Sequence, residues 1–253
     1  MTQWLLLAGK EVARIGLGTN RLRNTPEHIA LVREAVAAGI GVVDTAHVYT
    51  GGESEEAVGA AFSPIPDSCV LATKGGRHGV APEVLRAQIE ESLRRMQVTS
   101  IELYYLHRVD PEAPLEESLN AIREYCDSGK IRHVGLSQVG IEEIERARRV
   151  VPVAAVQNHY NLSERSFEDV VDYCAAEGIP FLPYFPLHGE GGSALAEIAE
   201  QHDATTVQIT LAWLLKRSAT MLPIPGTLSL EHLRENLEAL EIDLTDAEFQ
   251  ALA

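Results

Sequence analysis

The chain has 253 residues, of which 45% are hydrophobic, so it can bury a large core, and all-β domains or α/β barrels of this length often form one domain. Acidic residues outnumber basic ones by 37 to 21, and the formal net charge of -16 argues against nucleic acid or an anionic membrane as a partner. The three cysteines (Cys69, Cys126 and Cys174) are widely spaced, which favours free thiols in a reducing cytoplasm over disulfides or a zinc site. No run approaches the roughly 20 apolar residues of a transmembrane helix, so we expect a cytoplasmic protein without a membrane segment or a metal.

Eight short apolar runs alternate along the chain with segments of helical periodicity. Each run is continuously apolar, as a parallel sheet buried on both faces requires. The intervening segments repeat apolar residues at helical spacing, for example Ile29, Val32 and Val36, and glycines such as Gly39 and Gly178 follow the helix ends. The runs are residues 14–17, 41–44, 70–73, 101–107, 131–136, 153–157, 179–183 and 221–225.

Eight strand and helix units in a chain of this length predict an α/β fold, a single (β/α)₈ TIM barrel that spans residues 1–253 as one domain. Residues 4–12, with a turn at 8–10, predict an N-terminal β-hairpin that closes the bottom of the barrel. The main alternative is an open doubly wound sheet. However, Gly16-Leu17-Gly18 lacks the third glycine, and the helix directly behind it, that a dinucleotide-binding fingerprint needs.

Ionisable residues stand at the ends of three of these runs, where the active sites of such barrels lie. Asp44 ends the second run, Lys74 follows the third, His107 ends the fourth, and Tyr49 comes five residues after Asp44. Taken singly, Asp44 is more often a helix cap and His107 a satisfied core histidine, whereas a lysine beside a buried strand is costly unless it is paired. Because all four fall on one rim, we expect them to form a catalytic site.

These four residue types suit the reduction of a carbonyl group. A tyrosine hydroxyl has a reference pKa of about 10, so a nearby cation must stabilise its phenolate if it is to exchange a proton near neutral pH. Lys74 can supply that cation, Asp44 can hold the ammonium in place, and His107 can donate a hydrogen bond to a carbonyl oxygen. The set therefore predicts Tyr49 as the proton donor, and the reductant must be a cofactor.

Motifs along essentially the whole chain resemble short, bacterial-type members of the aldo-keto reductase family. They include Ile15-Gly16-Leu17-Gly18-Thr19, Asp44-Thr45-Ala46-His47-Val48-Tyr49, Ala72-Thr73-Lys74, Leu106-His107, Gly135-Leu136-Ser137, Val156-Gln157 and Ile224-Pro225-Gly226-Thr227. The resemblance implies a barrel that binds a nicotinamide dinucleotide without a Rossmann fold. It also implies a catalytic tetrad of Asp44, Tyr49, Lys74 and His107, which agrees with the roles argued from the residues themselves.

The resemblance further implies a set of cofactor contacts. Ser137 and Gln157 would hold the nicotinamide carboxamide and Tyr184 would stack on its ring, while Thr227 and Asn236 would contact the adenosine half. The other contacts expected are Gly18, Thr19, Gln138, Gly226, His232 and Glu235.

The family often places a lysine and an arginine around the adenosine 2′-phosphate, where this chain has Gly226 and His232. A backbone loop and a helix starting near Ser229 can still bind phosphate. We therefore expect the protein to prefer NADPH over NADH, by a smaller margin than where a lysine and an arginine both bind the 2′-phosphate. Use of NADH remains possible.

Two other functions fit parts of the same pattern. Lys74 could act as a Schiff-base nucleophile in an aldolase-type barrel, although Asp44 would raise its pKa rather than lower it. Alternatively, the protein could keep the nicotinamide as a regulatory ligand without catalysis. The partner expected is a small-molecule carbonyl substrate, and the protein a monomer or small homo-oligomer. Arg108, beside His107, could attract an anionic substrate, but an arginine there is more often solvated or paired.

Overall fold

A curled parallel sheet forms the centre of the protein in a computed structural model that describes residues 3–62, 64–189 and 192–252. Six strands pair with one another in chain order, each hydrogen-bonded to the next. They are β3 (Leu17–Gly18), β4 (Val42–Asp44), β5 (Val70–Gly75), β6 (Ile101–Leu106), β7 (Ile131–Ser137) and β8 (Val153–Gln157).

Two extended segments close this sheet into a barrel without being regular strands. In and directly after the expected strands 179–183 and 221–225, pairing is limited to isolated parallel bridges, from Val156 to Phe181, from His159 to Tyr184, from Phe181 to Met221 and from Gly18 to Gly226. The cause is four residues that have no N–H to donate to a ladder, namely Pro180, Pro183, Pro223 and Pro225. The α/β barrel prediction is confirmed, with two of its strands interrupted by proline.

The first barrel strand is also shorter than the expected residues 14–17. Only Leu17 and Gly18 are regular strand, because the partner segment on one side contains the prolines. Backbone hydrogen bonds still join this strand to the proline-containing segment. The N–H groups of Gly16 and Gly18 donate to the carbonyls of Pro223 and Pro225 at 3.0 and 3.1 Å.

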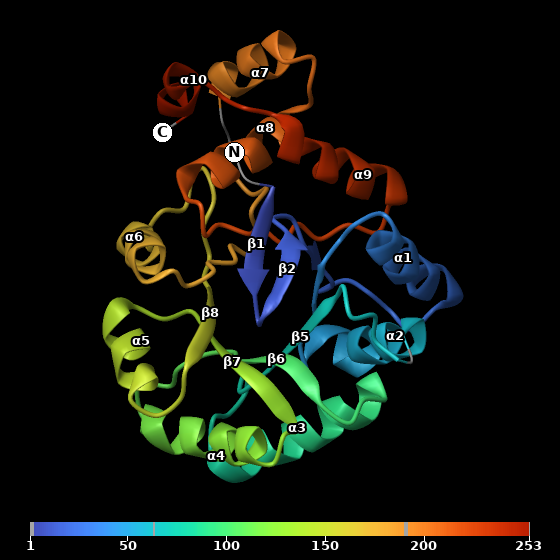
Figure 1. The fold of residues 1–253 in the computed structure, drawn as a ribbon, viewed down its shortest axis with the longest axis vertical. Helices are drawn as coiled ribbons and strands as arrows, with labels where there is room; N and C mark the ends of the chain where they lie inside the picture. The colour runs from blue at the N-terminus through green and yellow to red at the C-terminus, as the bar shows by residue number, and fades with distance from the viewer. Residues whose placement is uncertain (1–2, 63, 190–191, 253) are drawn as a thin grey trace.

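Helices surround the strands, and α7 and α10 lie outside α8 (Figure 1). Their ends follow ordinary capping rules. The Thr25 side chain accepts from the His28 N–H at the start of α1, and Gly178 ends α6 with a positive φ of 67°. The helices are α1 (Pro26–Ala37), α2 (Glu53–Ala61), α3 (Pro82–Met96), α4 (Leu115–Asp127), α5 (Ile141–Arg148), α6 (Glu168–Glu177), α7 (Gly192–Gln201), α8 (Thr206–Arg217), α9 (Leu230–Glu238) and α10 (Asp246–Ala251), with short 3₁₀ turns η1 (Tyr49–Gly52) and η2 (Ala239–Glu241). None of the helices within the described residues is long and apolar enough to cross a membrane.

The N-terminal hairpin is present, with a tighter turn than expected. Strands β1 (Trp4–Leu7) and β2 (Lys10–Ala13) are joined by Ala8 and Gly9 alone, and Lys10 pairs with Leu7. Both turn residues have positive φ, 50° and 76°, as a type I′ hairpin turn requires.

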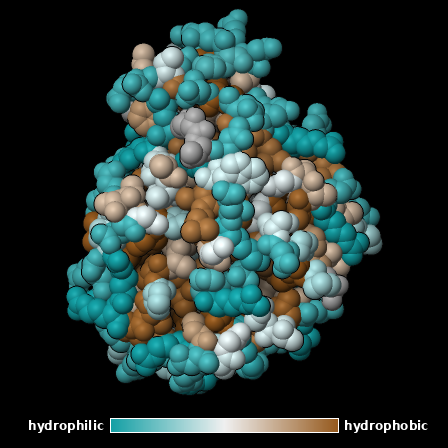
Figure 2. Space-filling view, in the orientation of Figure 1, coloured by the Kyte–Doolittle hydropathy of each residue, from teal (hydrophilic) through white to brown (hydrophobic). Residues whose placement is uncertain are grey.

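The hairpin covers the end of the barrel at which the strands begin. Val12 packs so closely on Gly41, just before β4, that a Cβ at Gly41 would lie 2.8 Å from the Val12 side chain. The Lys10 ammonium donates to the Cys69 carbonyl, just before β5, at 3.1 Å. Figure 1 is viewed from this end. Figure 2 shows hydrophobic residues exposed on this face, surrounded by mostly hydrophilic ones.

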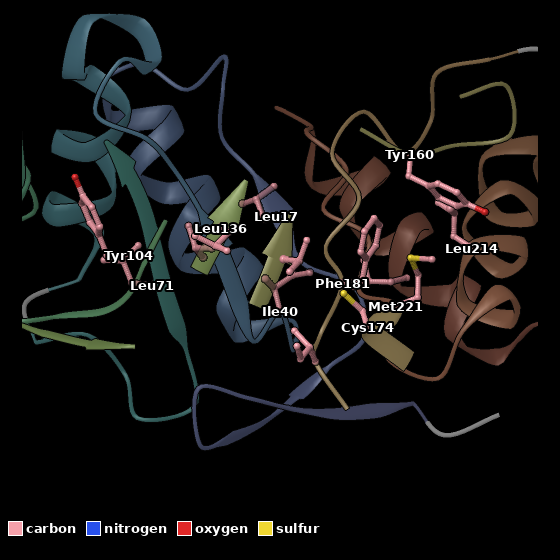
Figure 3. Close-up of a cluster of buried hydrophobic side chains, with 14 of the residues drawn as sticks. Leu17, Ile40, Leu71, Tyr104, Leu136, Tyr160, Cys174, Phe181, Leu214 and Met221 are labelled. Atoms are coloured by element: carbon pink, nitrogen blue, oxygen red, sulfur yellow. The ribbon is translucent and has the colours of Figure 1, made fainter. Parts of the chain in front are cut away.

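The core has two layers. An outer layer lies between the strands and the helices, and Figure 3 shows part of it, with Leu17, Leu71 and Leu136 from the barrel strands and Leu214 from α8. An inner layer fills the barrel and includes Leu7 and Val12 of the hairpin. Because successive side chains of a strand point to opposite faces, each strand contributes to both layers, which explains its continuous hydrophobicity.

Arg14 is a buried charge that ties the closing segment to α8. Its guanidinium donates to the carbonyls of Leu215, Ser218 and Met221 at 2.8, 2.5 and 3.1 Å. Burial lowers the pKa of Arg14 to about 10, so it remains charged near neutral pH. Carbonyls at the end of α8 carry negative partial charge, which compensates this buried cation.

Candidate active site

Because side chains alternate along a strand, every second residue of each barrel strand points into the barrel, including those at its carboxyl end. Val42, Ala72 and Tyr105 belong to the inner layer, and Asp44, Lys74 and His107 stand two residues after them. The same step of two leads from Ala155 to Gln157, from Leu182 to Tyr184 and from Ile224 to Gly226. These positions therefore form the uppermost layer of the barrel interior, at the carboxyl ends of the strands.

A buried ion pair lies at the centre of this layer. The Lys74 ammonium is 2.5 Å from an Asp44 carboxylate oxygen and also donates to the Thr45 carbonyl at 2.8 Å. Gln157 donates its side-chain amide to the other Asp44 oxygen at 2.9 Å. Burial would lower the pKa of Lys74, but Asp44 and Tyr49 together outweigh it and raise that pKa. The ammonium is therefore kept charged inside the barrel.

Tyr49 reaches the ion pair from the loop after β4. Its hydroxyl lies 3.5 Å from the Lys74 ammonium, which also sits 5.0 Å from the centre of the Tyr49 ring. The ring meets His107 edge-on, with centroids 6.1 Å apart and planes at 86°. Tyr49 is half-buried, whereas Asp44, Lys74 and His107 are buried. The four residues expected from the sequence thus come together, and the phenol is the one most accessible from outside.

His107 is held neutral. Burial, followed by the positive charges of Lys74, Arg77 and Arg108, lowers the pKa of His107 to about 2. Its Nδ1 is buried and makes no hydrogen bond within the described residues, while the ring lines the cleft above the tetrad. A neutral imidazole has one N–H, so His107 is suited to donating a hydrogen bond rather than a proton.

Because His107 is neutral in the folded protein, we expect the free energy of unfolding to fall in acid. The folded-state pKa of about 2 lies below the value of about 6.5 for an unfolded histidine, so the unfolded chain binds the proton first as the pH falls. As the pH drops below about 6.5, the contribution of His107 to the free energy of unfolding should fall by up to about 1.4 kcal/mol per pH unit. We expect His107→Gln to flatten the dependence of the free energy of unfolding on pH between 4 and 6.5, measured by urea denaturation. An unchanged slope would contradict the neutral assignment.

A buried polar network supports the loop between Asp44 and Tyr49. Glu55 in α2 is fully buried, accepts from the Thr73 hydroxyl at 2.6 Å and pairs with Arg95 at 3.3 Å. Arg95 also donates to the His47 carbonyl at 2.9 Å. Sequence reasoning assigned no role to this network, although Gly52-Glu53-Ser54-Glu55 is a further segment that resembles the aldo-keto reductase family. Its contacts fix the backbone that carries Tyr49.

A cleft of about 780 Å³ opens above the tetrad. Asp44, Tyr49 and His107 line it, together with seven of the residues expected to bind the cofactor, namely Gly18, Thr19, Ser137, Gln138, Gln157, Tyr184 and Gly226. The other four do not line it. They lie in the loop after Gly226 and in α9, and are Thr227, His232, Glu235 and Asn236. Glu235 there accepts a hydrogen bond from the Thr205 hydroxyl at 2.6 Å.

The lining fits a nicotinamide dinucleotide. Tyr184 presents a flat aromatic ring that His159 covers on one face, with centroids 5.2 Å apart and planes at 8°. Ser137 and Gln138 add a hydroxyl and an amide. Arg21, which the sequence did not single out, donates to the Gly226 carbonyl at 3.0 Å and adds a positive charge. Together these groups offer a stacking surface, polar groups for a carboxamide and a cation for phosphate.

Comparisons with known proteins agree with this geometry. The aldo/keto reductase family model matches residues 14–193 and 189–253. An uncharacterized oxidoreductase from Schizosaccharomyces pombe is 36% identical over 263 residues, which cover 95% of this chain and 86% of that protein. Pyridoxine 4-dehydrogenase from Escherichia coli is 32% identical over 267 residues, which cover 95% of this chain and 93% of that protein.

A solved structure gives the same result in three dimensions. An aldo-keto reductase from Klebsiella pneumoniae in complex with NADPH superposes with a TM-score of 0.90 at 30% identity, covering 100% of this chain and 94% of that one. The match extends along the whole barrel. This chain therefore belongs to the aldo/keto reductase family.

Proposed function

We propose that this protein is an NADPH-dependent oxidoreductase that reduces a small aldehyde or ketone to the alcohol. One observation carries the proposal: the Tyr49 hydroxyl, the charged Lys74 ammonium and the neutral His107 ring converge below a cleft lined by Tyr184 and polar amides. Family membership supports it, as does the NADPH complex of the similar Klebsiella protein. A cytoplasmic location and a monomeric or small homo-oligomeric state stay predictions.

Each tetrad residue has one task in this scheme. His107 donates a hydrogen bond to the substrate carbonyl oxygen and orients it beside the Tyr49 hydroxyl. Tyr49 passes its proton to that oxygen as negative charge develops there. Lys74 stabilises the phenolate that remains, and Asp44 keeps the ammonium in position. When bound, the reduced nicotinamide supplies the hydride that the carbonyl carbon receives.

The residues on the other half of the rim hold the cofactor in this proposal. Tyr184 stacks on the nicotinamide ring, and Ser137 and Gln157 bind its carboxamide. Gln157 also donates to Asp44, so one side chain connects the cofactor site with the catalytic carboxylate. A shift of Gln157 would therefore disturb both.

A substitution at the start of α9 tests the expected preference for NADPH over NADH. His232 is exposed, and its N–H is capped by the Ser229 hydroxyl at 3.4 Å. We expect His232→Arg to tighten NADPH binding by about three- to tenfold and to leave NADH unchanged, because a guanidinium can hold the 2′-phosphate through two parallel hydrogen bonds. Fluorescence titration with both cofactors measures this. Equal changes for the two would place His232 away from the phosphate.

The charge state of Lys74 disfavours the aldolase alternative. A Schiff-base lysine must be neutral to attack a carbonyl, and enzymes achieve this by lowering its pKa. Here the pKa of Lys74 is raised, and its ammonium is held by Asp44 and the Thr45 carbonyl. Within the described residues, we find no feature that favours a purely regulatory role over catalysis.

A screen of aldehydes and ketones with NADPH and with NADH tests the proposal. We expect at least one aldehyde to cause loss of the reduced-nicotinamide absorbance, and the corresponding alcohol to appear in equal amount. Regulatory binding would give affinity for NADPH with no turnover of any carbonyl compound. An aldolase would instead be trapped covalently on its substrate by borohydride.

A further inference from the structure

The cleft carries a charge opposite to that of the protein as a whole. The chain has a formal net charge of -16, yet Arg21, Arg77 and Arg108 line the cleft. Among the lining residues that the structure describes, Asp44 is the one acidic side chain, and Lys74 neutralises it. The cleft is therefore a positively charged site in an acidic protein, which attracts anions selectively.

The three arginines divide between the two halves of the rim. Arg21 follows β3 and donates to Gly226, on the half with the proposed cofactor residues. Arg77 follows β5 and Arg108 follows β6, which places both on the half with Lys74 and His107. Arg21 would therefore be the cation for the phosphates of a bound cofactor, and Arg77 and Arg108 stand beside the space above the tetrad.

Arg77 and Arg108 are not used by the fold. Neither side chain makes an ion pair or a hydrogen bond with any described residue, and Arg77 is half-buried while Arg108 is exposed. Some arginines on the outer helices are paired, such as Arg86 with Glu124 at 2.8 Å and Arg146 with Glu116 at 2.9 Å. Others, such as Arg149, have no side-chain partner among the described residues, so what distinguishes Arg77 and Arg108 is their place on the cleft. Two cations without protein partners at the edge of a reactive site are suited to binding the anionic group of a ligand.

We propose that the substrate is a small aldehyde or ketone that carries a carboxylate or a phosphate, bound by Arg77 and Arg108. This assignment rests on the proposed reductase function. The carbonyl oxygen then lies at Tyr49 and His107, and the anionic end points to the arginines. A guanidinium binds either anion through parallel hydrogen bonds, so the two arginines orient the molecule as well as attract it.

Matched substrates test the charge requirement. The wild-type protein is assayed at saturating NADPH with 4-carboxybenzaldehyde and with its neutral methyl ester, and with glyceraldehyde 3-phosphate and glyceraldehyde. We expect kcat/KM for at least one anion to exceed that of its neutral partner by about tenfold or more at low salt. The excess should shrink as ionic strength rises. The pair that shows the larger ratio distinguishes carboxylate from phosphate.

Variants locate the effect. Arg77→Gln, Arg108→Gln and the double variant should lower kcat/KM for the preferred anion, by about tenfold or more in the double variant, through a higher KM. The neutral substrates and the affinity for NADPH should not change. Arg149→Gln is the matched control, because it removes the same charge from an exposed site at the end of α5, outside the cleft.

Three results would overturn the assignment. Equal turnover of each anion and its neutral partner would remove the charge requirement. Equal losses for charged and neutral substrates in the double variant would make the arginines structural, and a selective loss of NADPH affinity would assign them to the cofactor. Absence of NADPH consumption with all four aldehydes, while another carbonyl compound of the broader screen is reduced, would overturn the anion site alone. Absence of turnover in the whole screen would overturn the proposed reductase, and the anion site with it.

Discussion

Tyr49→Phe should reduce carbonyl turnover by about 10²- to 10⁴-fold while leaving NADPH affinity nearly unchanged. The substitution removes one oxygen, which lies 3.5 Å from the Lys74 ammonium, and keeps the aromatic ring against His107. It deletes the proton donor without emptying the space that the ring fills. Because the proton is transferred in the transition state, the loss should appear in kcat more than in KM.

Steady-state kinetics with a reactive aldehyde, together with a fluorescence titration of NADPH, separates these effects. Tyr173→Phe is a suitable control, since its hydroxyl lies on the outer helices beside Glu145 and Arg148. That variant should retain full activity. If Tyr49→Phe also kept most of its turnover, another acid would supply the proton and the role proposed for Tyr49 would be wrong.

Lys74→Met should have the second large effect, and its dependence on pH separates the two enzymatic alternatives. The oxidation of an alcohol requires Tyr49 to lose its proton first. In the wild-type protein the charged ammonium stabilises the resulting phenolate. Without it, oxidation should fall most near neutral pH and recover in part as the pH rises, because alkali can remove the proton without help from a cation.

A Schiff-base enzyme would respond differently to the same substitution. The variant would have no amine to attack the substrate, and alkali would not restore one. The measurement is alcohol oxidation by wild type and variant across pH. A variant profile that stays at background at every pH, combined with borohydride trapping of the wild-type protein on a carbonyl substrate, would favour the aldolase. Asp44 loses its cation in Lys74→Met, so Lys74→Arg, which keeps the charge, is a useful comparison.

The tetrad could be predicted from the sequence because two simple rules combine at these positions. Buried strands appear as continuous apolar runs, and barrel active sites lie where such runs end. An ionisable residue at the end of a run is therefore conspicuous, as Asp44, Lys74 and His107 are. The structure adds the reason that they face one another: each stands two residues after a side chain of the inner core layer.

Features that depend on tertiary neighbours could not be predicted in the same way. The prolines around residues 181 and 224 were visible in the sequence, but only the three-dimensional pairing shows that they reduce two strands to isolated bridges. Glu55 was given no role from the sequence, because its burial depends on contacts with Thr73 and Arg95 from two other elements. In the sequence Arg77 is likewise an ordinary loop residue, and only the structure shows that it lines the cleft.

The contacts to the adenosine half stay predictions, as does the single domain. Thr227, His232, Glu235 and Asn236 were carried over from the family resemblance, and they lie outside the cleft that holds the tetrad. Glu235 already accepts a hydrogen bond from Thr205, so an adenosine contact would have to share or replace that bond. Cofactor titrations with variants at these positions would measure their contributions one at a time.

The central claim is that the nicotinamide gives a hydride to a carbonyl carbon while Tyr49 gives a proton to its oxygen. NADPH carrying deuterium at the transferring position of C4 tests it most directly, with the alcohol product analysed by mass spectrometry. We predict one carbon-bound deuterium per alcohol molecule in the wild-type protein, and almost no labelled alcohol from Tyr49→Phe. An alcohol formed by the wild-type protein without deuterium would contradict direct hydride transfer, as would a carbonyl compound converted while NADPH is not consumed.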